Sequence, residues 1–246
     1  SSCIEIESGE LESGESAFCF CSSLTSVYLP KCTKIGRHAF SSCTSLHTVS
    51  IPSCTYIGYD IFYDLFNEAG LNIKEITLNS TTPPTLANVE TLGKYAMFRV
   101  PASALSAYYN DPIWSEPELK NRLITIDDVI DYDVETSAQS TEPGLGRKID
   151  KEDMRKVVTL KVSGTINSYD IIAMNNKMIN LRWLDLSDAT IVGCNHEYYT
   201  GYATSDNIVG NRMFYDHDKY LSIKLPKNAE RIDAEAFAGC NNLKEV

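Results

Sequence analysis

The sequence has 246 residues, of which 43% are hydrophobic and 22% are charged, and its formal net charge is −11. This composition is that of a globular protein with room for one large or two modest domains, and no apolar run approaches the ~18 residues that a membrane span needs. Because neutralised phosphates supply most of the affinity for nucleic acid, the acidic balance argues against DNA or RNA as a ligand.

Two copies of one repeat stand near the start of the chain, over residues 18–36 and 40–58, and an offset of 22 residues aligns them. In both copies, Val-x-Leu-Pro or Val-x-Ile-Pro alternates as a short strand does when its apolar side faces inward. Pro30 and Pro52 end these strands, because proline has no amide hydrogen to give to a ladder. One coil of this length cannot bury its own apolar edge, so the repetition predicts coils that stack on one another.

Further copies follow along the chain. A third copy begins at Phe62, carries an insertion and resumes the spacing at Ile73. Two more begin at Phe214 and Phe237, and residues 181–191 have the Leu-x-x-Leu-x-Leu spacing of an ordinary leucine-rich repeat. We therefore expect an α+β fold, a leucine-rich-repeat solenoid with strand-rich coils of about 22–24 residues and few short helices, arranged in two arrays.

The order of the segments predicts three parts. Residues 1–126 are expected to be the C-terminal part of one array, closed by a cap at about 80–126 in which Ser103 is the predicted N-cap of a short helix. Residues 127–146 contain six acids and no base, so residues 127–148 are predicted to be an acidic linker, and a strand at its start stays an open alternative. Residues 149–246 are expected to start a second array.

Three stretches resemble a known family. The repeat "AFCFCSSLTSVYLPKCTKIG" (17–36) is similar to the BspA-type leucine-rich repeat of bacterial cell-surface proteins. Residues 98–114, "FRVPASALSAYYNDPIW", resemble the element that closes such arrays, and residues 157–192 resemble the segment that opens one in proteins of gut and oral anaerobes. The resemblance implies an exported protein of the bacterial cell surface or extracellular space that binds a partner without a chemical step or a cofactor.

The eight cysteines are best explained as buried free thiols. A metal site would need paired ligands at metal-binding spacing, which the sequence lacks, and a disulfide between neighbouring coils stays an open alternative. Five cysteines fall at repeat positions where a small apolar group packs: Cys21, Cys32, Cys43, Cys54 and Cys240.

The sequence predicts no catalytic, cofactor-binding or metal-binding residues, and hence no enzyme. It has no nucleophile elbow, phosphate-binding glycine loop or HExxH motif. Its one local cluster of Cys, His and Glu, at 194–197, is interpreted as a polar loop. The acids of 127–133 lack the glycine and bidentate glutamate of a calcium loop. The three tyrosines of residues 194–207 either face a sugar or protein ligand or pack against the adjacent coil.

The predicted binding surface is the row of strand side chains that point away from the core, which in a solenoid form one continuous face. Tyr28 and Trp183 are the large aromatic residues on it, and aromatic residues are enriched at binding hot spots. The outward residues of the two arrays are Ser26, Tyr28, Thr48, Ser50, Glu75 and Thr77, then Thr159, Lys161, Trp183, Asp185, Ser222 and Lys224. The candidate partner-binding residues among them are Tyr28, Ser50, Thr77, Lys161, Trp183, Asp185 and Lys224.

These observations favour non-catalytic surface recognition or adhesion, with a protein or glycan partner bound along the outward face. Two alternatives remain: a structural spacer that displays other domains, and an accessory domain of a larger secreted hydrolase. The repeat that begins at Phe237 stops at Val246, where the earlier copies continue through a strand and a return arm. We expect the natural chain to continue past Val246, and we expect self-association through this uncapped end.

Overall fold

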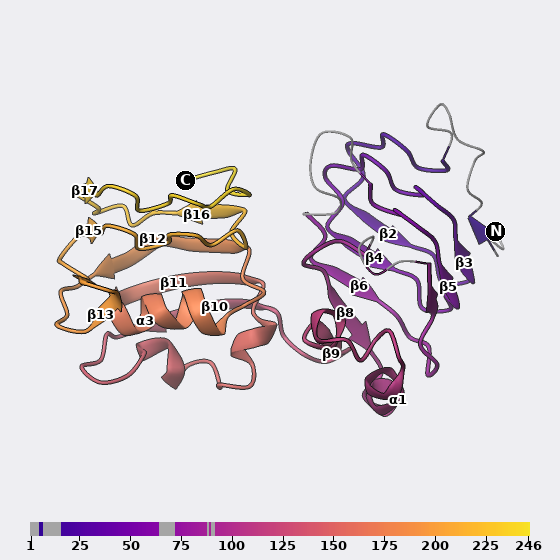
Figure 1. The fold of residues 1–246 in the computed structure, drawn as a ribbon, viewed down its shortest axis with the longest axis horizontal. Helices are drawn as coiled ribbons and strands as arrows, with labels where there is room; N and C mark the ends of the chain where they lie inside the picture. Colours follow the sequence, from indigo (N-terminus) through magenta and orange to yellow (C-terminus); the bar gives the residue numbers. More distant parts are fainter. Residues whose placement is uncertain (1–4, 7–15, 64–71, 88, 90–91) are drawn as a thin grey trace. The chain divides into compact units, whose positions relative to one another are not determined.

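The computed structural model describes residues 5–6, 16–63, 72–87, 89 and 92–246. The chain divides into two compact units, Ser1–Asp128 and Val129–Val246, each with a hydrophobic core of its own (Figure 1). Cys3 and most of the insertion after Phe62 lie outside the described residues.

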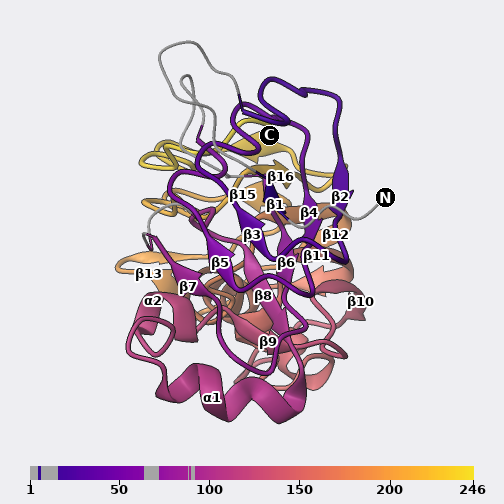
Figure 2. The same cartoon turned by 90° about the vertical axis from the view of Figure 1, so that its right-hand side faces the viewer.

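The first unit contains two parallel sheets, whose strands are labelled in Figure 2. The five-stranded sheet contains β2 (Ser26–Tyr28), β4 (Thr48–Ser50), β6 (Glu75–Thr77), β8 (Met97–Val100) and β9 (Leu123–Thr125). The four-stranded sheet contains β1 (Glu5–Ile6), β3 (Lys34–Ile35), β5 (Tyr56–Ile57) and β7 (Thr85–Leu86). Chain-adjacent coils therefore supply neighbouring strands in both sheets, as the repeat predicts.

Equivalent residues of successive coils pair in register, because each coil repeats the same backbone path. Val27 lies opposite Val49, and Val49 lies opposite Ile76. The rings of Phe18 and Phe40 stack with their centroids 5.3 Å apart, and those of Phe40 and Phe62 are 6.0 Å apart. This packing of like residues is what lets one coil cover the apolar edge of the next.

Two short helices follow β8 in the first unit: α1 (Leu105–Asn110) and α2 (Pro117–Lys120). The 3-10 turn η1 (Ala102–Ala104) comes directly before α1. The side chains of Tyr108 and Trp114 are fully buried, and the Trp114 ring contacts both Tyr108 and Phe98 edge-on at 5.1 Å. The expectation that Ser103 caps the helix is wrong. The 3-10 turn places Ala104 at the N-cap, where no side chain accepts a hydrogen bond.

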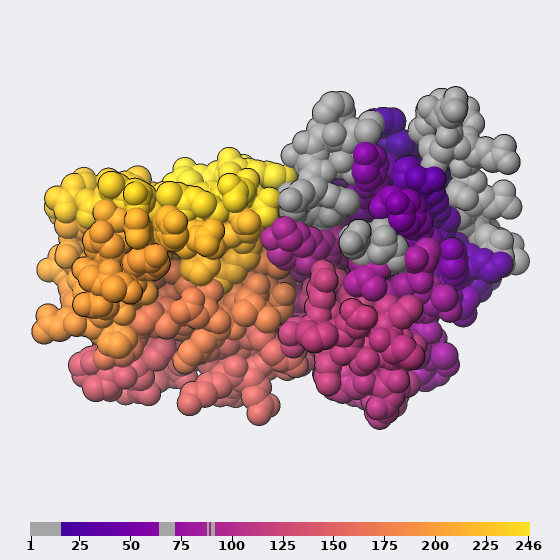
Figure 3. Space-filling model, in the orientation of Figure 1, coloured from indigo at the N-terminus to yellow at the C-terminus, as the bar shows by residue number. Residues whose placement is uncertain are grey.

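The second unit is built on the parallel sheet β10-β11-β12-β16. Figure 3 shows its segments following one another in colour bands along the chain. Its strands are β10 (Asp131–Thr136), β11 (Thr159–Ile166), β12 (Trp183–Ile191), β13 (Glu197–Tyr199), β14 (Tyr202–Ala203), β15 (Ile208–Val209), β16 (Ser222–Lys224) and β17 (Arg231–Ile232). Its helical segments are η2 (Gly144–Arg147), η3 (Met154–Lys156), α3 (Ser168–Ile172) and the π-helical turn η4 (Ala173–Lys177). Strand-rich coils, parallel sheets and few short helices agree with the leucine-rich-repeat prediction.

The acidic linker expected at 127–148 is replaced, from residue 129 onward, by ordered structure of the second unit. Strand β10 pairs with β11 over its whole length, from Asp131 opposite Thr159 to Thr136 opposite Gly164. Leu145 in η2 is fully buried. The acids of β10 alternate with inward side chains, so they occupy the solvent side of an edge strand and do not interrupt it.

Candidate functional site

The outward face of β2, β4 and β6 brings together the three residues predicted for the first unit. Tyr28 lies opposite Ser50, and Ser50 lies opposite Thr77, so their side chains form one row across neighbouring strands. Tyr28 is 70% exposed, the highest value among the large hydrophobic side chains of the described residues. This row therefore presents an aromatic ring beside small hydroxyl side chains.

Arg99 extends the same row on β8, opposite Thr77, and was not among the predicted residues. Its guanidinium Nε donates to Glu75 Oε2 at 2.6 Å, and its Nη1 donates to the carbonyl oxygens of Ile126 and Asp128. The charge of Arg99 is therefore used within the unit. The sequence pattern that could have identified Arg99 is the alternation in "MFRV", which points Arg99 outward, but this segment was predicted to be part of the cap.

In the second unit, charged side chains of alternating sign run across the sheet. Asp133 on β10, Lys161 on β11, Asp185 on β12 and Lys224 on β16 lie opposite one another in that order. The structure thus places three of the predicted residues in one row, and Asp133 joins them. The fourth, Trp183, lies in the adjacent row between Thr159 and Ser222 and is only partly exposed.

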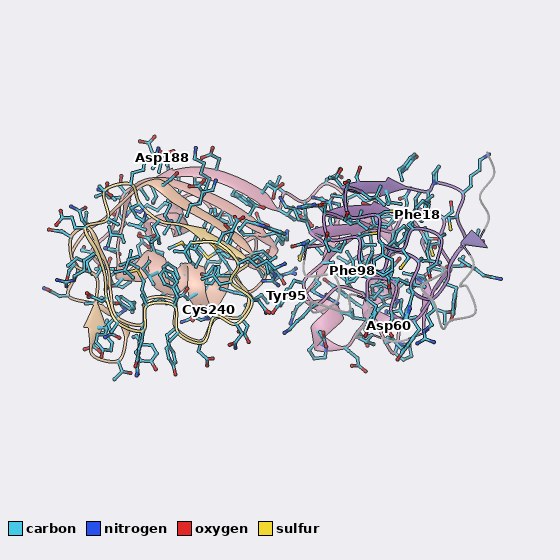
Figure 4. The ribbon with its side chains drawn as sticks, turned by 90° about the horizontal axis from the view of Figure 1, so that it is seen from above. Phe18, Asp60, Tyr95, Phe98, Asp188 and Cys240 are labelled. Carbon is cyan, nitrogen blue, oxygen red and sulfur yellow. The ribbon has the colours of Figure 1, made fainter. Side chains whose placement is uncertain are left out.

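These charges are paired with one another across the strands. Lys224 Nζ lies 3.2 Å from Asp185, while Asp188 lies 3.2 Å from Lys161 and 2.7 Å from Lys227. Hydrogen bonds from Lys227 and Lys161 lower the pKa of the Asp188 carboxyl. Figure 4 places Asp188 at the outer side of the second unit, across from Cys240. This face is therefore charged but internally neutralised.

The loop at 194–207 forms an antiparallel hairpin of β13 and β14, and its three tyrosines are partly buried. The Tyr198 hydroxyl donates to the Asn211 carbonyl at 2.8 Å, and the Tyr199 ring contacts those of Tyr202 and Tyr215. Packing against the adjacent coil is therefore the alternative that the structure supports for these rings.

The cluster at 194–197 does not form a reactive constellation. The Glu197 carboxylate accepts from the Gly201 amide at 2.9 Å, the Cys194 sulfur accepts from the His196 amide at 3.4 Å, and the His196 ring stacks on Tyr169. Within the described parts of the chain, no group of three or more His, Cys, Asp or Glu side chains is arranged to hold a metal ion.

A cavity of the second unit lies beside this hairpin, with a volume of about 1060 Å³. It opens at the carboxyl ends of β10, β11 and β12, which Figure 1 shows on the side of the unit where β13 lies. Its lining comes from residues 138–140, 167, 169, 192–196 and 203–206. Sequence reasoning flagged the segment 194–207 but not the cavity, because the segments that complete it are far apart in the chain.

The cysteines are free in the described structure: Cys19, Cys21, Cys32, Cys43, Cys54, Cys194 and Cys240. The Cys43 thiol donates to the Phe18 carbonyl at 3.0 Å, and the Cys240 thiol donates to the Phe214 carbonyl at 2.8 Å. In both copies the cysteine therefore occupies the same position, where its thiol contacts the phenylalanine that begins the preceding copy.

Comparison with protein families agrees with this geometry. The model of the BspA type leucine-rich repeat region matches residues 2–69 and 206–246, in six copies. These segments are BspA-type leucine-rich repeats. Repeats of this type are commonly surface-associated modules of protein interaction and are generally non-catalytic. No curated protein matches the chain. Among the described residues, no helix has both the length and the apolar character to cross a membrane.

Proposed function

We propose that the chain is a non-catalytic recognition module of the bacterial cell exterior, that its two units are stacked-coil arrays, and that the outward strand face of the first unit binds a protein or glycan partner. The BspA-type repeats support the interaction role, and the in-register rows of outward side chains supply a continuous surface for it. No cofactor and no chemical step belong to this proposal.

The observation that carries the proposal is the exposed ring of Tyr28 at one end of the Ser50–Thr77 row. A tyrosine gives a large contact area for little loss of conformational entropy, and its hydroxyl can still find a hydrogen-bond partner. The flanking hydroxyl side chains are short, so a ligand can approach the backbone of the sheet closely. We therefore place the centre of the binding surface at Tyr28.

The paired charges of the second unit favour a second role for that part of the chain. Since Lys161, Asp185, Asp188 and Lys224 are matched among themselves, a partner would have to break these pairs before it could use the charges. We therefore propose that the strand face of the second unit is mainly a spacer, which holds the first unit away from the cell.

The test is a binding screen of the whole chain against a panel of immobilised glycans and extracellular-matrix proteins. Tyr28→Ala is expected to lower the affinity for the bound ligand at least about tenfold, as loss of an aromatic hot spot does. Tyr59→Ala is the matched control, since Tyr59 is 42% exposed but lies in a turn outside the five-stranded sheet. No bound ligand, or equal losses in the two variants, would contradict the recognition role of this face.

A further inference from the structure

The cavity of the second unit is an open one, bounded by loops that follow three neighbouring parallel strands. Residues 138–140 follow β10, Asn167 and Tyr169 follow β11 and residues 192–196 follow β12, while residues 203–206 complete the wall. Parallel strands bring their carboxyl ends to one edge of the sheet, and the loops at that edge commonly form ligand sites.

Buried polar side chains fix these loops to one another. The side-chain Nδ2 of Asn167 donates to the backbone carbonyl of Gln139 at 2.7 Å, and this bond connects the loop after β11 to the loop after β10. Ser168 and Thr204 exchange hydrogen bonds in both directions: Thr204 N donates to Ser168 Oγ at 2.9 Å, and Ser168 N donates to Thr204 Oγ1 at 3.2 Å. Asn167 and Thr204 are each 4% exposed, and Ser168 is fully buried.

The wall after β12 is held in the same way. The Gly193 amide donates to Asp206 Oδ1 at 2.6 Å, and the Cys194 amide donates to the Thr204 carbonyl at 3.0 Å. The Asp206 carboxylate is thereby fixed at the rim. A site whose loops are already fixed loses little conformational entropy when a ligand binds, so the cavity is organised in advance of binding.

The cavity combines a flat ring surface with uncharged polar groups. The rings of Tyr169 and His196 stack with centroids 4.1 Å apart and planes 6° apart, and His196 is exposed. Asn195, Ser140 and Ser205 line the same space. Asp206 is the only carboxylate in the lining, which holds no lysine or arginine.

This chemistry selects among ligand classes. A phosphate, sulfate or carboxylate ligand would meet Asp206 without a cation to offset the repulsion, so the lining disfavours anions. A neutral sugar has a flat C–H face that packs on a ring, and its hydroxyls bind to amide, hydroxyl and carboxylate oxygens. The volume of about 1060 Å³ lies just above the usual range for ligand pockets, which leaves room for more than one sugar ring.

We propose that this cavity is a binding site for a neutral saccharide, with the Tyr169–His196 pair as the platform under one sugar ring and Asn195 and Asp206 as the groups that bind its hydroxyls. The site is separate from the strand faces, because neither Trp183 nor the charged row of the sheet lines it. It therefore holds whether or not the strand face of the first unit binds a partner.

The test is a calorimetric titration of the whole chain with maltotriose, cellotriose, lactose and mannobiose, alongside glucuronic acid and inorganic phosphate as anionic probes. At least one neutral saccharide is expected to bind with a Kd below about 10 mM. His196→Ala is expected to weaken that binding at least about tenfold, because it removes the outer ring of the platform. Asp206→Asn keeps an oxygen for the Gly193 amide and is expected to weaken binding without unfolding the loop.

Trp183→Ala is the matched control, since it removes an aromatic residue of the same unit from the strand face. Binding that survives both His196→Ala and Asp206→Asn, binding lost in Trp183→Ala instead, or binding of the anionic probes alone would each overturn the proposal. Failure of all four neutral saccharides to bind would overturn it as well. The strand-face proposal is tested separately by Tyr28→Ala, so the two can fail independently.

Discussion

Each of two repeat cysteines gives its thiol hydrogen to a phenylalanine carbonyl of the neighbouring coil, Cys43 to Phe18 and Cys240 to Phe214. Burial raises the pKa of the Cys43 and Cys54 thiols to about 11, so neither forms the reactive thiolate near neutral pH. The same side chain is thus an apolar packing group and a hydrogen-bond donor, which explains why it recurs in the copies that begin at Phe18, Phe40 and Phe237 without a cross-link.

We predict that a thiol reagent such as iodoacetamide labels the native protein first at the exposed Cys21, and that Cys32 and Cys54 react only after unfolding. All cysteines should then react in denaturant without a reducing agent. Mass spectrometry of timed samples measures both steps. If labelling in denaturant requires prior reduction, the cysteines form disulfides and the packing account is wrong.

His217 occupies the repeat position that holds cysteine in other copies, and its ring is partly buried beside Tyr220. Burial, assisted by the charge of Lys219 and opposed by Asp216, lowers the pKa of His217 from its ordinary 6.5 to about 4. Between these two values the unfolded chain binds more protons than the folded one. The free energy of unfolding should therefore fall as pH falls from about 6.5 to 4.

We predict that His217→Cys, which restores the repeat residue, makes the denaturation midpoint less dependent on pH over this range. Urea titrations at several pH values compare the two chains. An unchanged slope in His217→Cys would show that His217 does not bear this pH dependence.

Left-handed backbone recurs at two repeat positions, two residues before and two residues after the phenylalanine of a copy. The sequence gives little sign of the first position, because none of the residues there is a glycine. His38 and Asp60, one repeat apart, have positive φ, and so do Arg212 and Glu235 at the same place in later copies. Arg212 and Glu235 carry opposite charge, with Arg212 Nε 2.5 Å from Glu235 Oε2, and His38 Nε2 lies 3.8 Å from the Asp60 carboxylate. Asp and Asn tolerate this conformation better than most residues, and here stacking with the adjacent coil holds even bulky side chains in it.

At the scale of elements, the linker prediction failed: a strand at the start of this segment was left open, but the segment was not assigned to the sheet of the second unit, where β10 pairs with β11. The count of acids predicted a linker, whereas the period-two pattern of Asp131, Asp133 and Glu135 with Tyr132, Val134 and Thr136 between them is that of an edge strand. Charged residues on an edge strand discourage pairing with other chains, so these acids suit the place they occupy.

Two glycines of the second unit share the same left-handed backbone conformation, but only one of them is in close contact with a neighbouring strand. Gly164 on β11 and Gly201 in the hairpin both have φ near +80°, but a Cβ at Gly164 would lie 2.1 Å from the Thr136 carbonyl oxygen, whereas one at Gly201 would meet nothing within 4 Å. The backbone of β10 thus approaches β11 at Gly164 more closely than any side chain allows.

We predict that Gly164→Ala destabilises the second unit by more than about 3 kcal/mol, because β10 must move away from β11. Gly201→Ala has the same φ without the clash and should cost only about 1 kcal/mol. Chemical denaturation followed by circular dichroism measures both. Equal costs for the two variants would show that the approach of β10 to β11 does not limit this position.

The strands of the first unit and their outward residues were predictable because a repeat fixes both period and direction. Once Val27 and Val49 are inward, Tyr28 and Ser50 must point outward. The cavity was not predictable, since its lining depends on how loops after three different strands meet. Likewise, the pairing of Asp188 with Lys161 depends on a register shift between Lys161 and Ser163 that no sequence period encodes.

At the scale of the whole molecule, the chain consists of two units, each with its own core of apolar residues. BspA-type repeats match in both, at 2–69 in the first and 206–246 in the second. The segments between the matched regions are those that depart from the repeat: the helical end of the first unit and the long strands β10 to β12. The cavity lies among the loops that follow β10, β11 and β12.

The most direct test of the central claim is hydrogen–deuterium exchange of the whole chain with and without the strongest ligand from the glycan and matrix-protein panel. The account predicts that the ligand slows amide exchange in residues 26–28, 48–50 and 75–77, the strands that carry Tyr28, Ser50 and Thr77. Slowed exchange confined to the turns that carry Tyr59, with the three strands unchanged, would contradict recognition through the outward strand face.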